Sequence, residues 1–484
     1  MSVKTTHKKY DKYAPKWQRA RDVMAGQDQV HEGGTRYLPK LKDQTTEDYA
    51  AYVMRAPFYN ASWRTVAGLL GLLFRKPPEI IVPTAIEPYL EDISMAGVPF
   101  SMFAEQVALE DLTIGFYGIL VDHPPAPEVA PGEALTVAKA EAMGLRPAMQ
   151  LYLAECILNW RFRQVNNKHT LCMVVLAEEC CEPKNEFEDS VKTQYRVLDL
   201  DEAGFYRVRV FEVDKDGKDV LVKGPIYPLQ NNKPMTEIPF EADFEFGEPP
   251  LIDLIDMNLS HYRTSADYEH GCHFTGLPTP VVSGYTAPIQ ANGQPPPKLF
   301  IGSSSAWLLP DPQASASFLE FTGQGLTALK DNLERKETIM SVLGAKMLAT
   351  EKAGVEAFKT MATRSAGETS ILSAISINVS LRVERSLTTF SAWGGGVDSE
   401  VEFELNRDFL PVAMDAPTLQ AYMQAWQTGA ISKQDLFALF KRGDLIEAEK
   451  SFEDQQAEID SEPPPVPPGA PKPVDPTKKP PVDD

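Results

Sequence analysis

A heptad pattern between residues 326 and 348 limits the possible folds of this chain more than any other feature of its sequence. Leucine or methionine recurs every seven residues, and two further leucines follow members of that series by three positions; the six residues are Leu326, Leu329, Leu333, Met340, Leu343 and Met347. Side chains with this spacing share one face of a helix, which needs another surface to cover it. The pattern predicts a helix about 35 Å long whose charged face stays in water.

Two further helices are predicted on either side of the heptad. The first, Leu251–Cys272, carries six residues on one face: Leu254, Met257, His261, Ser265, Tyr268 and Cys272. The other begins at Ser365–Glu368, which has the form of a capping box, carries an apolar stripe from Leu372 to Trp393 and ends at three glycines. Residues 278–322 are rich in glycine and proline between short strands. We therefore expect a compact module inserted between two helices.

The remaining segments predict a chain of the α+β class. Residues 46–74 read as two helices, and residues 93–122 as a helix followed by a strand. Alternating apolar residues between 150 and 240 predict an antiparallel sheet. A strand at 399–406 and two short helices around Gly429 follow, with Ser432 capping the second. The basic, aromatic first 43 residues could dock on a neighbour or pack on their own domain, and packing is the preferred interpretation.

Composition narrows the class of protein further. The 484 residues have a net charge of −21, so non-specific affinity for nucleic acid is expected to be poor unless the cations are clustered. No run of eighteen uncharged apolar residues is present, which predicts no membrane span and a protein kept in the cytoplasm. Five cysteines are irregularly spaced, which favours reduced thiols: Cys156, Cys172, Cys180, Cys181 and Cys272.

The sequence offers little chemistry for catalysis. It contains no G-x-x-x-x-G-K-[ST], G-x-G-x-x-G, H-E-x-x-H or G-x-S-x-G motif, so we predict no enzymatic activity and no cofactor. The best metal candidate is His270-Gly-Cys-His273 with His261 nearby. A closed zinc site needs four ligands and no second cluster is present, so a helix end that packs on a neighbour is the preferred interpretation.

Four passages resemble the portal proteins of tailed double-stranded DNA bacteriophages. Residues 249–284 look like their stem-entering helix, and residues 428–445 are similar to their G-x-I-S crown segment. Residues 364–387 resemble the start of their long wing helix, although Ser365-Ala-Gly367 departs from the usual Ser-Gly by one insertion. Residues 33–78 look like one portal subfamily of previously uncharacterised domains. The matching positions are Asp253, Asn258, Ser260, Asp267, Gly429, Ile431 and Ser432.

The resemblance implies a ring of twelve copies at one capsid vertex of a virion, assembled in the host cytoplasm. The ring would be the channel for packaging and ejecting double-stranded DNA. Its partners would be the terminase large subunit, the major capsid and scaffolding proteins, and later the head–tail adaptor, with no membrane. The implied domains are wing 1–250, first stem helix 251–275, clip 276–322, second stem helix 323–348, tunnel loop 349–363, long wing helix and strand 364–411, helical crown 412–460 and Pro-rich tail 461–484.

The resemblance also gives roles to particular residues. The heptad face would pack against the stem helix of a neighbouring subunit. Lys346, Lys352 and Lys359 would form rings that touch DNA, whereas taken singly they are ordinary solvated lysines. Two other classes stay open: a virion scaffold or adaptor without a channel, and, third, a metal-dependent DNA-processing enzyme.

Overall fold

The computed structural model describes most of the chain as a mixed helix and sheet protein, which confirms the α+β prediction. The described residues are 2–124, 143–165, 167–230, 233–276, 279–284, 313–319, 324–346, 371–394, 401–407, 409, 416–442, 445–446 and 450–461. The chain divides into two compact units, Met1–Arg407 and Asp408–Asp484. Each unit is described by itself.

Four α-helices open the larger unit: α1 (Lys8–Ala25), α2 (Gln27–Glu32), α3 (Thr46–Arg55) and α4 (Ala61–Leu73), with a 3₁₀ turn at Gly34–Arg36. The predicted pair at 46–74 is present as α3 and α4, and the Asn60 side chain caps α4 by accepting from the Trp63 amide at 2.9 Å. The first helix was not predicted, because Pro15 interrupts its pattern. The expected packing of this segment is confirmed, since Trp17 is fully buried.

The middle of the larger unit is a three-stranded sheet covered by two helices. Helix α5 (Phe100–Thr113) leads into β2 (Tyr117–Asp122), which pairs with β3 (Ala148–Leu153) and β11 (Phe240–Ala242). Helix α10 (Ile371–Gly394) buries six members of its predicted stripe: Leu372, Ile375, Val379, Val383, Leu387 and Phe390. Short elements complete this region, namely β1 (Glu79–Ile81) paired with β14 (Glu402–Glu404), and 3₁₀ turns at Glu87–Asp92 and Ala154–Cys156.

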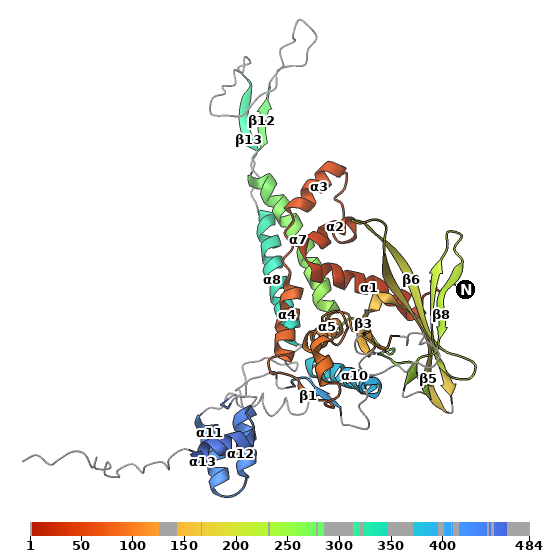
Figure 1. Ribbon diagram of the computed structural model, residues 1–484. Helices are drawn as coiled ribbons and strands as arrows, with labels where there is room; N and C mark the ends of the chain where they lie inside the picture. Colours follow the sequence, from red (N-terminus) through yellow and green to blue (C-terminus); the bar gives the residue numbers. More distant parts are fainter. Residues whose placement is uncertain are drawn as a thin grey trace, which may run out of the picture. The chain divides into compact units, whose positions relative to one another are not determined.

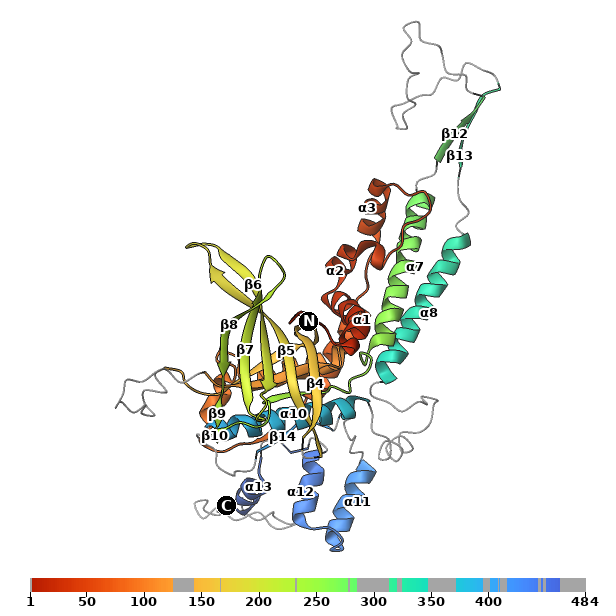
Figure 2. The same cartoon turned by 90° about the vertical axis from the view of Figure 1, so that its right-hand side faces the viewer.

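The predicted antiparallel sheet between 150 and 240 is confirmed as five strands in sequence order. They are β4 (Ile157–Val165), β5 (Lys168–Pro183), β6 (Asp189–Leu200), β7 (Tyr206–Val213) and β8 (Asp219–Ile226), followed by the small hairpin β9 (Leu229–Gln230) and β10 (Lys233–Pro234). Aromatic rings join this sheet to α1, since Trp160 of β4 lies 5.6 Å from Phe116, and Phe116 lies 5.7 Å from Trp17 of α1. Strands β5 and β6 are longer than predicted and continue past their neighbours as a two-stranded ribbon (Figure 2).

Two long helices flank the inserted module. Helix α7 (Ile252–Gly276) and helix α8 (Gln324–Lys346) lie side by side (Figure 1), as the first two central helices were predicted. Strand β12 (Thr279–Ser283) follows α7, β13 (Ser315–Leu319) precedes α8, and the two pair antiparallel. The predicted strand at 298–309 and the capping box at Ser365–Glu368 lie outside the described residues.

The smaller unit contains three described helices: α11 (Ala416–Gln427), α12 (Lys433–Arg442) and α13 (Phe452–Ser461). Ser432 caps α12 as predicted, because its Oγ accepts from the Asp435 amide at 3.0 Å. Only two helices were predicted here. The third begins at a similar cap, in which the Ser451 Oγ accepts from the Asp454 amide.

Candidate functional site

The α7–α8 pair is the centre of the candidate site, and the two helices run antiparallel. A side chain added at Gly271 would lie 2.6 Å from Leu326 Cδ2, and ten residues further along α8 Lys336 bonds to Ser260, eleven residues earlier on α7. Helix α7 also packs on α1, α3 and α4, so it lies between α8 and the N-terminal helices. The close approach at Gly271 shows why a small residue suits this position.

A buried lysine joins the two helices at mid-length. Lys336 on α8 is only 9% exposed, and its Nζ donates to the Ser260 carbonyl oxygen at 2.9 Å and to Thr264 Oγ1. Burial lowers the pKa of this amine, and the nearby Arg263 and Arg335 lower it further. Burying this charged side chain costs free energy, and its two hydrogen bonds form in only one alignment of the helices. Lys336 therefore favours that alignment of α7 and α8.

Further polar contacts continue this seam along α7. His261, which is 5% exposed, lies 3.3 Å from the Glu337 carboxylate, and its burial lowers the imidazole pKa. Asn258 is fully buried; its Oδ1 accepts from the amide and hydroxyl of Ser62 on α4, and its Nδ2 donates to the Tyr59 carbonyl. These contacts tie α7 to α8 on one side and to α4 on the other.

The six heptad positions have different surroundings. Met340 is 2% exposed, while Leu326, Leu329, Leu333 and Leu343 are half-buried, and Met347 lies outside the described residues. The Leu326 contact with Gly271 shows that part of this stripe is already covered within one chain. Packing of the heptad against another subunit stays a prediction.

The opposite face of α8 is exposed and charged. It presents Lys330, Asp331, Glu334, Arg335, Thr338, Ser341 and Val342. Lys330 and Glu334 form an exposed pair at 3.8 Å, which contributes little stability. This face is the surface that α8 offers to water or to a partner.

The side chains of the three lysines predicted to touch DNA lie outside the described residues. Lys346 is the last residue of α8, and its side chain is outside the described set, as are Lys352 and Lys359 entirely. Their role stays a prediction.

The metal candidate on α7 has aromatic neighbours. The His270 ring packs edge-on against Tyr52 at 5.1 Å and against Phe274 at 4.7 Å, and burial lowers its pKa. The described residues contain no group of three or more metal-binding side chains. The five cysteines are free thiols. Within the same residues, no helix has both the length and the apolar character needed to cross a membrane.

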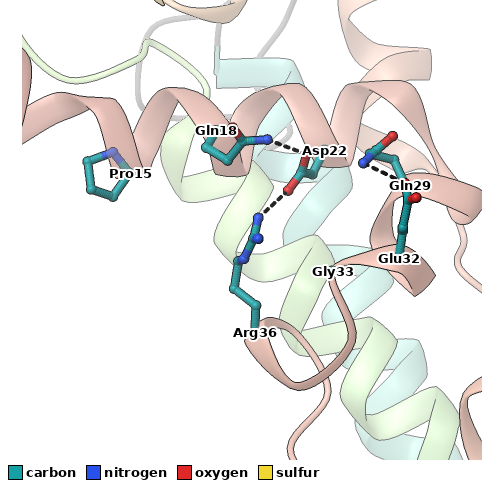
Figure 3. Close-up of a pocket in the computed structure, with 7 residues that line it drawn as sticks. All are labelled: Pro15, Gln18, Asp22, Gln29, Glu32, Gly33 and Arg36. Carbon is teal, nitrogen blue, oxygen red and sulfur yellow. Dashed lines mark hydrogen bonds and ion pairs between the residues drawn. The ribbon is translucent and has the colours of Figure 1, made fainter. Parts of the chain in front are cut away.

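An open pocket of about 510 Å³ lies between α1, α2 and the turn that follows (Figure 3). Asp22 is 2% exposed at its base and accepts hydrogen bonds from Gln18 at 2.7 Å, from Arg36 at 3.0 Å and from the Tyr37 hydroxyl. A buried carboxylate with these three donors holds the turn in place. The pocket is therefore explained by the structure of the N-terminal segment.

A second buried carboxylate lies under α10. Asp111 of α5 is 9% exposed, and burial raises its pKa to about 7. Arg382 of α10, which pairs with Asp243 at 3.1 Å, opposes that rise, and the Asp243 charge adds to it. The group is thus a pH-sensitive part of the core between α5 and α10.

The sequence contains a pattern from which the buried position of Lys336 could have been predicted. This lysine occupies the position seven residues after Leu329 and seven before Leu343, so a charged residue interrupts an otherwise apolar series. A polar residue at such a core position commonly specifies register. Asp111 had no comparable signal, because its helix is apolar on most sides.

Comparisons with known proteins give one family match and one structural neighbour of note. A family model described as "Domain of unknown function (DUF4055)" matches residues 250–394, the stretch that holds α7, α8 and α10. No curated protein matches the chain. A solved structure described as "Neck of empty GTA particle computed with C6 symmetry" is 12% identical, with 80% of this chain and 92% of that chain covered and a TM-score of 0.36. That similarity establishes neither the fold nor the function of this chain.

Proposed function

We propose that this chain is a phage portal protein: a structural virion component, not an enzyme. Twelve copies form a ring at one capsid vertex, and double-stranded DNA passes through it during packaging and ejection. The terminase large subunit docks on the ring first and the head–tail adaptor later, while the major capsid and scaffolding proteins surround it.

One observation carries the proposal. The antiparallel α7–α8 pair has an inserted strand pair at its far end, and the long helix α10 follows it in the chain. The portal resemblance in the sequence implies this order of stem helix, clip, stem helix and wing helix. The register-specific contact at Lys336 supports a helix pair that must keep a defined alignment.

The negative charge of the chain supports a channel that binds DNA only weakly. A ring of subunits with net charge −21 repels phosphates, which keeps adhesion low and permits sliding. Lysines at the end of α8 and in the segment after it, Lys346, Lys352 and Lys359, would supply brief contacts. A carboxylate–metal nuclease would need clustered acids at a strand end, and assays with Mg²⁺ would reveal such an activity.

Negative-stain electron microscopy of the purified chain, with its mass in solution, tests the proposal. Rings of about twelve subunits with a central hole are expected. A chain that stays monomeric at high concentration would instead favour the second candidate, a scaffold or adaptor without a channel.

Replacing Lys352 and Lys359 by Ala tests the channel contacts. Altered DNA packaging or retention is expected, and intact rings with unchanged packaging would show that these two lysines do not have that role.

A further inference from the structure

The distal part of β5 and β6 is a two-stranded ribbon that no other described strand accompanies. Strand β4 pairs with β5 only as far as Leu176, and β7 pairs with β6 only from Tyr195 onward. Residues 179–193, here named the arm, pair with each other alone, and none of them is buried. An isolated ribbon is marginally stable in water, so a partner surface would stabilise it.

The arm has a strongly exposed apolar side. Phe187 at its turn is 87% exposed and Val191 is 61% exposed. Val191 lies opposite Cys181 in the ribbon register, and Pro183 lies two residues further along the same face. Cys181, Pro183 and Val191 therefore share one face of the ribbon, and Phe187 lies at its turn. Exposed apolar side chains on a projecting element indicate a docking surface.

The arm is also acidic. It carries five acids, Glu179, Glu182, Glu186, Glu188 and Asp189, against Lys184 and Lys192. Two of the acids are neutralised locally, since Lys192 pairs with Glu182 at 2.6 Å and Lys184 with Glu188 at 3.5 Å. Glu186 and Asp189 form no ion pair with the described residues, so they are available to a cationic partner.

A matching cationic surface lies on the N-terminal segment of the same chain. The first 43 residues carry ten Lys and Arg against five Asp and Glu, in a chain whose total charge is −21. Most cations of α1 are already used, because Lys9, Lys16 and Arg19 pair with Glu245, Glu248 and Asp256. Lys4, Lys8 and Lys12, here named the lysine stripe, are exposed and have no ion pair within the described residues.

The lysine stripe is held firmly on the sheet surface. The Ser2 hydroxyl donates to Asp219 at 2.7 Å, the Val3 amide donates to the same carboxylate at 2.9 Å, and the His7 amide donates to the Leu158 carbonyl at 2.8 Å. These bonds fix the segment before α1, and buried Tyr13 and Trp17 fix α1 itself, so the positions of the lysines are defined. A fixed surface loses less entropy when a partner binds.

We propose that the arm of one copy of this chain docks on the lysine stripe of a second copy, with Phe187 and Val191 as apolar anchors. The second copy fits because its stripe offers the unpaired cations that the arm lacks, whereas most other surfaces of so acidic a chain repel the arm. The inference rests on the proposed ring, since it names one contact between neighbouring copies.

Charge reversal tests the pairing directly. Full-length Glu186→Lys/Asp189→Lys and Lys8→Glu/Lys12→Glu should each weaken self-association about tenfold at 0.15 M salt, measured by sedimentation velocity or mass photometry. The chain with all four changes, and a 1:1 mixture of the two double variants, should regain wild-type association because opposite charges again meet. Phe187→Ser should weaken association, whereas Phe187→Leu should retain it.

Matched controls separate this contact from general charge effects and from misfolding. Glu202→Lys/Asp216→Lys makes the same charge change at two other exposed turns and should leave association unchanged. Thermal unfolding should be the same for all variants because the altered side chains are exposed. If the wild type forms rings and the arm variants associate as well as it does, the docking is overturned and the ring proposal stands. The same holds if the double variants associate weakly and the chain with all four changes does not recover. A wild-type chain that never assembles would overturn the ring proposal, and the docking with it.

Discussion

Asp111 shows how one buried carboxylate makes the stability of the core between α5 and α10 sensitive to pH. Its pKa rises from an ordinary 3.8 to about 7 on folding, so between these values the folded chain holds a proton that the unfolded chain has lost. The free energy of unfolding contributed by this group therefore falls as the pH rises from about 4 to 7. Arg382 is close but already pairs with Asp243, and it does not cancel the effect.

Replacing Asp111 by Asn should remove this dependence. We expect the variant to be more stable than the wild type at pH 8, by up to roughly 4 kcal/mol, and similar at pH 4, because Asn keeps the shape without the buried charge. Urea unfolding at both pH values measures the difference. An equal difference at pH 4 and pH 8 would contradict the assignment.

At the scale of the helix pair, the buried charge of Lys336 lowers the free energy of unfolding. Its amine is bonded to a carbonyl and a hydroxyl and forms no direct ion pair with the described residues; burial, Arg263 and Arg335 lower its pKa, and the Asp267 charge opposes this only in part. Lys336→Met should raise the free energy of unfolding by about 1 kcal/mol or more at pH 7. Because the folded pKa is lowered, wild-type stability should also rise with pH as the medium approaches the ordinary lysine pKa, and the variant should lack that rise.

Lys330→Met is the matched control for this change. Lys330 lies on the same helix, but its side chain is 62% exposed and forms a 3.8 Å ion pair with Glu334. Its replacement should alter stability by less than about 0.5 kcal/mol. Chemical unfolding of both variants at pH 7 and in the alkaline range compares them; similar effects at the two positions would show that burial of Lys336 is not the cause.

The three-stranded sheet depends on a glycine in β2. A Cβ at Gly118 would lie 2.1 Å from Cζ of Phe240, a ring that is 4% exposed on the neighbouring strand β11. Gly118→Ala should therefore cost about 1–3 kcal/mol through overpacking. Gly247→Ala, where nothing lies within 4 Å, is the control and should be close to neutral. Combining Gly118→Ala with Phe240→Leu should recover part of the loss in thermal unfolding, and full additivity would argue against the clash.

Elements with one regular apolar face could be predicted from the sequence, and the others could not. The stripe of α10 and the alternating strands β4 to β8 repeat their period long enough to be recognised. Helix α1 was missed because Pro15 lies within it, and the arm was missed because no buried side chains impose alternation there. The DNA-facing lysines depend on copies and residues that no single-chain pattern defines, so the candidate site was predicted only in outline.

At the scale of the whole molecule, the two units should unfold separately. Residues 408–484 form a compact unit of their own with the described helices α11 to α13, and Leu436 of α12 is 8% exposed within it. Calorimetry of the full chain should show two transitions. Leu436→Ala should lower only the transition of the smaller unit, by about 2 kcal/mol or more. A single transition that shifts as a whole would contradict the independence of the units.

The register of β12 and β13 also bears on how such a chain can change over generations. Ser283 pairs with Ser315, so the chain departs and returns at neighbouring points, and the α7–α8 pair does not depend on the length of what lies between residues 284 and 313. Doubling the length of a connection between two fixed points adds only about 0.6 kcal/mol of closure entropy. We therefore expect changes of length between these two points to leave the α7–α8 pair intact.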